Sequence, residues 1–269
     1  MQNKIPKIIH QIWIQGYENI SNDNKKKIEN TIKIHNNWKY ILWDEKKIEE
    51  LLNNKNNIKY KNKYNKFIYM HQKIDFAKIL ILNQFGGIYI DIDCDVIKNL
   101  DNLFEKINEY DFIVSKISPK VDNVSNYLTC HKFNECYNNG IIVSKPNIDI
   151  CTFLMDNFKY ECNWYENKLM CIQNTTGPPI FNTIIDTYIK NNNINKILFL
   201  PYDYFEPCIG TNCHINNNTH IVHKHELSWL SDSQKKIFNF VTNYINLTHF
   251  LLTIIILIFI IIILINYFK

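Results

Sequence analysis

Arginine is absent from this chain, although it carries 30 basic residues against 26 acidic ones. Every basic side chain is therefore a lysine, which lacks the planar guanidinium that grips a phosphate or a guanine with two hydrogen bonds. The formal net charge of +4 is also small for 269 residues. We therefore do not expect nucleic acid to be a partner.

Cysteine is sparse as well, with eight residues in the chain, and no two of them form a C-x-x-C pair. The spacing that is typical of a structural zinc site is thus missing. Cys208 with Cys213, or Cys130 with Cys136, could close a short disulfide loop in an oxidising compartment. The sequence alone does not decide whether these bonds form.

The first ten residues lack the apolar core of a secretory signal peptide, whereas the other end of the chain is strongly apolar. Only Thr253 interrupts a run of Phe, Leu and Ile from 250 to 265, and residues 247–267 reach the roughly 20 residues that a membrane-spanning helix needs. We expect a single transmembrane helix over 247–267, preceded by a juxtamembrane segment at 233–246. Lys235 and Lys236 favour the cytoplasmic side for the preceding domain, with the lumenal side of secretory membranes as the alternative.

The remaining residues, 1–232, are long enough and apolar enough (46% hydrophobic over the whole chain) for one large α/β domain. Strands are expected at 5–14, 38–44, 88–93, 111–115 and 140–144, and helices at 22–35, 45–52, 74–85, 151–160 and 179–190. The stretch 53–66 is rich in Asn, Lys and Tyr, and we expect a surface loop there. Strands that alternate with helices predict a mostly parallel sheet with helices on both faces.

The most informative motif is the acidic run that follows the apolar residues 88–90. In a strand, side chains two positions apart point the same way, so Asp91 and Asp93 are expected to project together from the carboxyl end of this strand, where open α/β sheets bind ligands. Two neighbouring carboxylates repel each other unless a positive charge lies between them. A divalent cation that also bridges two phosphates would satisfy both groups.

Two other interpretations of the acidic run can be tested on the sequence. A calcium-binding loop that starts at Asp91 would need Gly at its sixth position and Glu at its twelfth, but the chain has Val96 and Asn102 there. An aspartyl phosphatase also places D-x-D after an apolar strand, and such enzymes usually add a Gly-Asp pair, which this chain does not contain. The calcium loop is excluded, and the phosphatase remains an alternative.

The segments 74–78 and 86–93 resemble the DXD sugar-binding region of glycosyltransferase family 32, which includes fungal initiating mannosyltransferases and inositol-phosphorylceramide mannosyltransferases. Segments at 6–13, 38–44, 139–146, 176–178, 201–207 and 223–229 resemble further blocks of that family in the same order. The resemblance covers residues 5–230. It implies a GT-A-like fold, with a Rossmann-like sheet, and a retaining transfer of a hexose from a nucleotide sugar.

The resemblance also assigns roles to particular residues. It implies that Asp91 and Asp93 are catalytic, that Asp93 and His223 bind a metal ion, Mn²⁺ or Mg²⁺, and that His225 is the substitute for His223. The residues that it implies for donor binding are Trp13, Asp75, Lys78, Asp91, Asn139, Gly177, Ser228 and Trp229. Lys78 departs from the family, which usually has Arg at that position, and Asp95 is expected to have a structural role.

The predicted function is therefore a metal-dependent hexosyltransferase that uses GDP-mannose or a UDP-sugar. We expect a lipid or a glycan as the acceptor, because the predicted helix over 247–267 would hold the enzyme at a membrane. The alternatives are a degenerate transferase that binds nucleotide sugars or glycans without turnover, and the aspartyl phosphatase. Donor sugar, acceptor and oligomeric state are not determined by the sequence.

Overall fold

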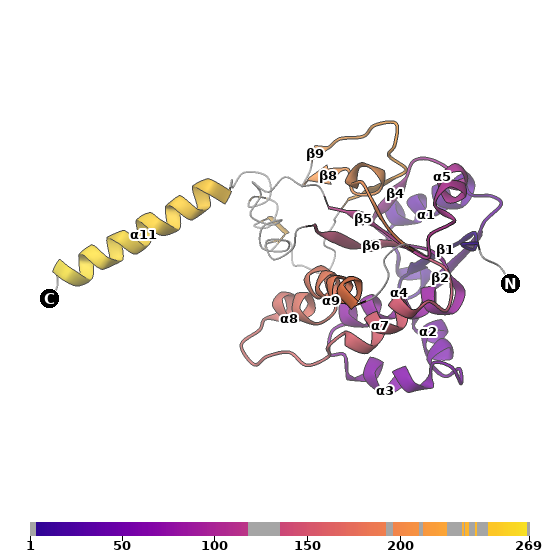
Figure 1. Ribbon diagram of the computed structural model, residues 1–269, viewed down its shortest axis with the longest axis horizontal. Coiled ribbons are helices and arrows are strands. Elements are labelled where there is room, and N and C mark those ends of the chain that lie inside the picture. The colour runs from indigo at the N-terminus through magenta and orange to yellow at the C-terminus, as the bar shows by residue number, and fades with distance from the viewer. Residues whose placement is uncertain are drawn as a thin grey trace.

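The computed structural model describes residues 4–117, 135–191, 196–209, 212–224, 233, 235–236, 240 and 247–267. Figure 1 shows a mixed α/β domain and a long helix near the C-terminus. The helices and strands, in chain order, are β1 (Ile8–Ile12), η1 (Tyr17–Asn19), α1 (Asn22–Ile34), β2 (Lys39–Trp43), α2 (Glu45–Leu52), α3 (Ile58–Lys66), α4 (Met70–Phe85), β3 (Gly87–Ile90), β4 (Cys94–Val96), α5 (Asp101–Ile107), β5 (Phe112–Lys116), β6 (Tyr137–Ser144), α7 (Asp149–Asn157), α8 (Lys168–Thr175), α9 (Pro178–Asn191), β7 (Ile197–Leu200), η2 (Tyr202–Tyr204), β8 (Cys208–Ile209), β9 (Asn212–Cys213), β10 (Ile221–His223) and α11 (Leu247–Tyr267).

A six-stranded sheet in the order β2-β1-β3-β6-β5-β7 forms the centre of the domain. Strand β1 pairs in parallel with β2 and β3, and β5 pairs in parallel with β7. Strand β6 instead runs antiparallel to both β3 and β5. The sheet is therefore mostly parallel, as predicted, and β6 is the one strand of the six that runs in the opposite direction. This reversal brings the first residues of β6 beside the last residues of β3.

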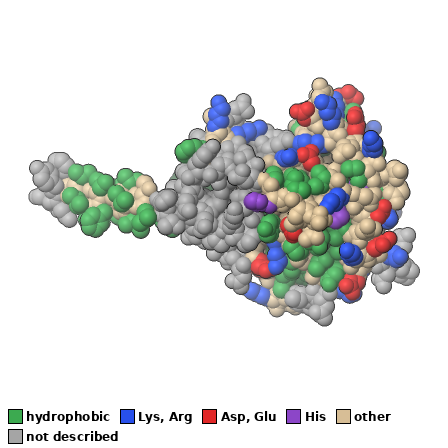
Figure 2. All heavy atoms as spheres, turned by 90° about the horizontal axis from the view of Figure 1, so that it is seen from above, with side chains coloured by type: hydrophobic (Ala, Val, Ile, Leu, Met, Phe, Trp, Pro, Cys, Tyr) green, Lys and Arg blue, Asp and Glu red, His purple; other side chains and the backbone are tan. Residues whose placement is uncertain are grey.

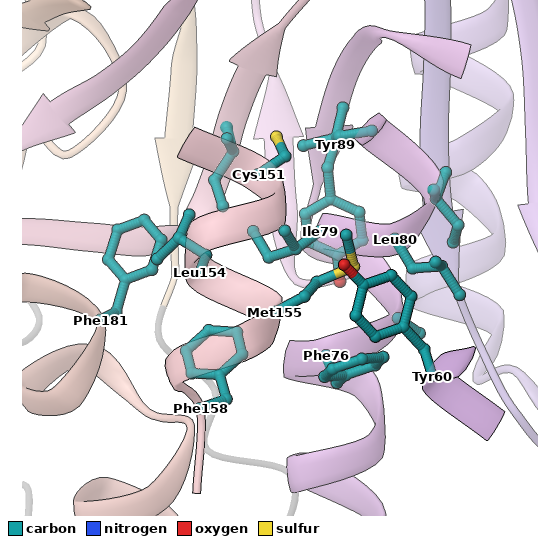
Figure 3. Close-up of a cluster of buried hydrophobic side chains, with 14 of the residues drawn as sticks. Tyr60, Phe76, Ile79, Leu80, Tyr89, Cys151, Leu154, Met155, Phe158 and Phe181 are labelled. Atoms are coloured by element: carbon teal, nitrogen blue, oxygen red, sulfur yellow. The ribbon is translucent and has the colours of Figure 1, made fainter. Parts of the chain in front are cut away.

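Side chains of the central strands alternate between two hydrophobic clusters, one on each face of the sheet. Ile88 and Ile90 belong to the cluster that includes α5, whereas Tyr89 between them belongs to the cluster that includes α4, α7 and α9. Figure 3 shows part of the second cluster, including Phe76 of α4 and Leu154 of α7. Helices thus cover both faces, as the alternation of strands and helices predicts.

The predicted surface loop at 53–66 is wrong in its second half, which forms α3. Tyr60 and Tyr64 are four residues apart, so they lie on the same face of this helix. Both rings are buried and contact Phe76, with centroids 5.8 and 6.3 Å away. The contacts of these two tyrosines therefore stabilise a helix in a segment whose Asn and Lys content had suggested a loop.

A pair of glycines connects α4 to β3, at the start of the acidic motif. Gly86 has a φ of 63°, and a Cβ there would lie 2.7 Å from the Cδ of Pro146. Gly87 has a φ of 98°, and a Cβ there would lie 2.4 Å from the carbonyl oxygen of Ile8. Glycine adopts both positive φ values without strain, and Gly87 lets β3 pack closely against β1.

Disulfide bonds join Cys208 to Cys213 and Cys162 to Cys171. The first closes the β8-β9 hairpin and was one of the two pairings considered from the sequence. Of the other considered pairing, Cys130 lies outside the described residues.

The transmembrane helix predicted over 247–267 is not supported. Helix α11 does form there, and its side chains are described and exposed from 251 to 265, as Figure 2 shows for its hydrophobic residues. Among the side chains that the structure describes, no helix is long and apolar enough to cross a membrane. This finding corrects both the predicted span and the membrane partner that it implied.

Candidate functional site

The two carboxylates of the acidic motif lie in the turn between β3 and β4. Strand β3 ends at Ile90, and the backbone N–H of Cys94 donates to the carbonyl oxygen of Asp91 over 3.2 Å. Asp91 and Asp93 therefore stand at the carboxyl end of a buried strand, as predicted, but a turn rather than strand alternation brings them together. A turn gives both carboxylates access to the same space beyond the sheet.

Strand β10 brings His223 to these carboxylates from a distant part of the sequence. It pairs antiparallel with β4, and His223 stands opposite Cys94 in the register. The Nε2 atom of His223 lies 3.3 Å from Oδ1 of Asp93 and 3.9 Å from Oδ2 of Asp91. The imidazole is almost completely buried. The structure thus places together the three side chains for which the sequence predicted catalysis or metal binding.

Gly140 of β6 keeps room beside this group. A Cβ at this position would lie 2.6 Å from Cε1 of His223 and 2.7 Å from Oδ2 of Asp91. Carboxylate oxygens and an imidazole nitrogen are common ligands of divalent cations in proteins. The donor atoms therefore fit a divalent cation held by Asp91, Asp93 and His223, and the lack of a side chain at Gly140 lets the imidazole and the Asp91 carboxylate lie against β6.

Cys94 is close to the same atoms but is not a convincing ligand. Its sulfur lies within 4.8 Å of ligand atoms of Asp93 and His223. The side chain, however, packs in the apolar cluster on the face of the sheet that carries α5. Burial, followed by the charges of Asp93 and Asp91, holds the pKa of the thiol well above its usual range. Without a cation the thiol therefore stays protonated.

The electrostatics of the group favour positive charge. Burial is the largest effect on the pKa of Asp91 and raises it, although Lys78 opposes this shift. Burial alone would lower the pKa of His223, but Glu206 and Asp93 outweigh it and hold this pKa well above its usual range. In the absence of a cation, the imidazole therefore holds a proton between carboxylates.

A second polar cluster surrounds Asp75 of α4. The carboxylate accepts hydrogen bonds from Asn139 over 3.1 Å and from Thr176 over 3.0 Å. The ammonium of Lys78, one helical turn along α4, lies 2.7 Å from Oδ1 of Asp75. These three donors come from α4, β6 and the connection between α8 and α9, so they fix the position of the carboxylate.

Lys78 and Tyr89 connect the two clusters. The Nζ atom of Lys78 lies 5.2 Å from the centre of the Tyr89 ring, and the Tyr89 hydroxyl donates to Oδ1 of Asp91 over 2.7 Å. Burial alone would lower the pKa of Lys78, but Asp75 and Asp91 outweigh it and raise this pKa. The ammonium therefore remains charged although water scarcely reaches it.

Sequence reasoning missed three residues at the site. Tyr89 lies within the expected strand at 88–93, and no role at the site was predicted for it. Glu206 lies 2.9 Å from Nδ1 of His223, and the amide of Asn138 lies 3.4 Å from the same atom. Glu206 belongs to one of the segments that resemble the family, but only the position of β10 shows which residue it contacts.

The other predicted residues lie as follows. Trp13 follows β1, where its backbone N–H donates to the carbonyl oxygen of Trp43 over 2.8 Å, and its ring is half-buried. Gly177 follows Thr176, next to the Asp75 cluster. Asp95 lies 3.3 Å from Lys224, in an ion pair outside the group of ligands. His225, Ser228 and Trp229 lie outside the described residues.

The sequence matches a family model described as a glycosyltransferase sugar-binding region containing a DXD motif, over residues 21–113. It is 34% identical over 232 residues to an uncharacterized glycosyltransferase of Acanthamoeba polyphaga mimivirus, which covers 84% of each chain. The chain therefore belongs to the DXD-containing glycosyltransferase family, and it is a glycosyltransferase. Members of this family generally bind a divalent metal ion.

Fungal proteins are more distant relatives. Inositol phosphoceramide mannosyltransferase 1 of Schizosaccharomyces pombe is 33% identical over 119 residues, which is 43% of this chain and 35% of the relative. A mannosyl phosphorylinositol ceramide synthase of Saccharomyces cerevisiae is 24% identical over 223 residues, 79% of this chain and 53% of the relative. The chain thus matches about a third to a half of the length of these fungal relatives.

Solved structures give weaker similarities. A structure titled PaToxG Glycosyltransferase has a TM-score of 0.49 at 19% identity, with 70% of this chain and 71% of that chain covered. Mouse xyloside xylosyltransferase 1 has a TM-score of 0.45 at 12% identity, with 80% and 96% covered. Scores below 0.5 do not establish a shared fold.

Proposed function

We propose that this glycosyltransferase transfers a hexose from a nucleotide-sugar donor, with Mn²⁺ or Mg²⁺ as its cofactor, to a lipid or glycan acceptor. GDP-mannose is the first donor to test, because the fungal relatives are named as mannosyltransferases or mannosyl-lipid synthases. UDP-sugars are the alternative. The resemblance to family 32 implies that the configuration of the sugar is retained.

One observation carries this proposal: Asp91, Asp93 and His223 converge at the carboxyl end of β3, and Asp75 with its donors lies beside them. The group gathers residues from α4, β3, β6 and β10, which are widely separated along the chain. A carboxylate oxygen of Asp93 lies 3.3 Å from Nε2 of His223, and one of Asp91 lies 3.9 Å from the same nitrogen. This arrangement suits a ligand that presents phosphate oxygens to a cation and sugar hydroxyls to a neighbouring carboxylate.

The protein groups would divide the work of binding and activation. Asp91, Asp93 and His223 would hold the cation, which supplies charge that stabilises the departing diphosphate. Asp75 would accept hydrogen bonds from hydroxyls of the donor sugar, because Asn139, Thr176 and Lys78 keep it in one orientation. Trp13 would stack against the base, and Lys78 would contribute a fixed positive charge beside both carboxylates.

The experiment that tests this proposal compares Asp93→Asn with Asp95→Asn. The full chain would be supplied with GDP-mannose and with a panel of UDP-sugars, with Mn²⁺ or with a chelator, and donor hydrolysis and transfer would be followed. Asp93→Asn should lose activity by about a hundredfold or more, because loss of a group that stabilises the transition state commonly costs this much. Asp95→Asn should remain active, since Asp95 pairs with Lys224 instead.

Full activity of folded Asp93→Asn in buffer that contains Mn²⁺ would contradict the assignment. Activity that survives the chelator would contradict the metal dependence. Release of phosphate from simple phosphate esters, without any use of nucleotide sugars, would favour the phosphatase instead. Binding of a donor without turnover would indicate a degenerate transferase.

A further inference from the structure

A buried carboxylate lies behind His223, on the side of the ring opposite to the acidic motif. Glu206 follows η2 and is only 2% exposed. Its backbone N–H donates to the carbonyl oxygen of Tyr202 over 2.7 Å, and the preceding residue, Phe205, is completely buried in the apolar cluster. Two residues later, Cys208 is joined to Cys213. Glu206 is therefore held firmly in place by its own segment.

The two nitrogens of the His223 ring contact different carboxylates. Nδ1 lies 2.9 Å from Oε1 of Glu206, whereas Nε2 lies 3.3 Å from Oδ1 of Asp93. An ionised carboxylate can only accept hydrogen bonds, so the contact with Glu206 requires a hydrogen on Nδ1. When a cation binds and the ring gives up its second proton, the hydrogen on Nδ1 leaves Nε2 as the nitrogen that presents its lone pair to the cation.

The amide of Asn138 is the competing partner of Nδ1. Its Nδ2 atom lies 3.4 Å away, while its Oδ1 atom accepts from the backbone N–H of Gly140 over 2.8 Å. An amide donor would favour a bare Nδ1, which is the opposite tautomer. The contact with Glu206 is shorter by half an ångström and involves a charge, so it is the stronger of the two.

We propose that Glu206 is a positioning residue, which holds His223 with its hydrogen on Nδ1 and so presents Nε2 to the cation bound by Asp91 and Asp93. Histidine ligands of metal ions generally donate their other N–H to a carboxylate or a carbonyl, which fixes the ring and makes the ligand nitrogen more basic. This inference rests on the proposed function, because it assumes that a cation binds at the site.

The charges around the site agree with this role. Four carboxylates, those of Asp75, Asp91, Asp93 and Glu206, surround Lys78 and His223. Even with His223 protonated, the group carries two more negative than positive charges. Burial of net negative charge is costly, so a cation held by Asp91, Asp93 and His223 would stabilise these described side chains. A carboxylate behind His223, instead of an apolar side chain, is consistent with that role.

The test measures binding of Mn²⁺ alone to the full chain, by electron paramagnetic resonance of the free ion. Glu206→Gln should weaken binding by about 10 to 100 times, as is typical when the partner of a metal-bound histidine is changed. Glu29→Gln, an exposed change on α1, should leave the affinity unchanged. Thermal unfolding of each variant would show that it is folded.

A second comparison separates positioning from a simple loss of negative charge. Glu206→Gln would also be made in a His223→Ala background. A residue that acts through His223 should then have little further effect, within about threefold, because coupled residues are not additive. An equal loss in both backgrounds, or no loss in either, would overturn the inference.

The tautomer of His223 gives a readout that does not depend on a folded variant. In the wild-type chain saturated with Mg²⁺, ¹⁵N nuclear magnetic resonance should show a hydrogen on Nδ1 and none on Nε2, and the opposite tautomer would overturn the inference. A wild-type chain that binds neither Mn²⁺ nor Mg²⁺ would overturn the proposed metal dependence itself. If instead the wild type binds the ion and Glu206→Gln binds it equally well, only the role of Glu206 is overturned.

Discussion

Lys78 is a charged side chain that has almost no access to water, with only 3% of its side chain exposed. It follows Asp75 by three residues on α4, and the two carry opposite charges. The chain contains a second pair with the same spacing, Asp44 and Lys47, whose side chains are 35% and 48% exposed. The two pairs have the same spacing in the sequence but differ in burial. Substitutions in both pairs therefore distinguish the effect of burial on stability from the effect of spacing.

Replacement of Lys78 by Met should reduce the free energy of unfolding by about 3 to 5 kcal/mol, because removal of one partner leaves buried carboxylates without compensation. Lys47→Met should change it by less than about 0.5 kcal/mol, as exposed pairs contribute little. Urea unfolding of the metal-free proteins would measure both values. Equal effects of the two substitutions would show that Lys78 is not the internal counter-ion of the site.

Among the elements, β6 has the closest relation to the site, since three consecutive residues at its beginning contact or border it. Gly140 is needed because a side chain would not fit at this position. Its φ is not positive, but an added Cβ would lie within 2.7 Å of both His223 and Asp91. Gly16 is the reverse case, with a φ of 83° and no atom within 4 Å of an added Cβ.

Gly140→Ala should lower Mn²⁺ affinity and transferase activity by about a hundredfold or more, because the methyl group would displace a ligand. We expect a loss of stability of about 1 to 3 kcal/mol from overpacking. Gly16→Ala should cost only backbone strain, about 1 to 2 kcal/mol, and leave metal binding intact. Metal titration and thermal unfolding of the two variants would check this, and wild-type affinity in Gly140→Ala would contradict it.

At the level of elements, the sequence was most informative where local patterns were strong. The helix that ends at Phe85 and the buried strand before Asp91 follow from the spacing of their apolar residues. Helix α3 was missed because its composition concealed two tyrosines at helical spacing. The reversed direction of β6 and the pairing of β10 with β4 depend on long-range contacts. The contact of Glu206 with His223 was therefore not predictable from local sequence.

For the molecule as a whole, the ring of His10 connects its own strand β1 to β2 and to the connection between α4 and β3. The indole N–H of Trp43 donates to Nδ1 over 3.1 Å, and Nε2 lies 2.9 Å from the carbonyl oxygen of Gly86. These contacts require a neutral ring with its hydrogen on Nε2, because an added proton on Nδ1 would meet the indole N–H. Burial, the main cause, lowers the pKa of His10 to about 4.

Stability should therefore fall as the solution becomes acidic. Between pH 6.5 and 4, the unfolded chain binds a proton at His10 that the folded chain does not, so the free energy of unfolding decreases as pH is lowered. From pH 7 to pH 5 the loss attributable to His10 should be about 2 kcal/mol. Urea unfolding of the wild type and of His10→Gln at both pH values would measure the part of this loss that is due to His10. The same pH dependence in both proteins would contradict this explanation.

The site as a whole can be compared with what the sequence implied. Asp91, Asp93 and His223 were named in advance and lie together, and so do Asp75, Lys78 and Asn139, although their roles remain predictions. Burial and hydrogen bonding within the clusters were not foreseen, since they depend on which strand edges meet.

The reversed strand has one more consequence, for how the protein can change over time. Consecutive side chains of a strand point in opposite directions, and at the start of β6 Asn138 contacts His223 whereas Asn139 contacts Asp75. Insertion or deletion of a single residue in β6 would turn the shifted side chains to the opposite face of the sheet and disturb both clusters at once. Evolution can therefore vary the identity of neighbouring residues in β6, but the length of this strand should stay fixed among enzymes that share this arrangement.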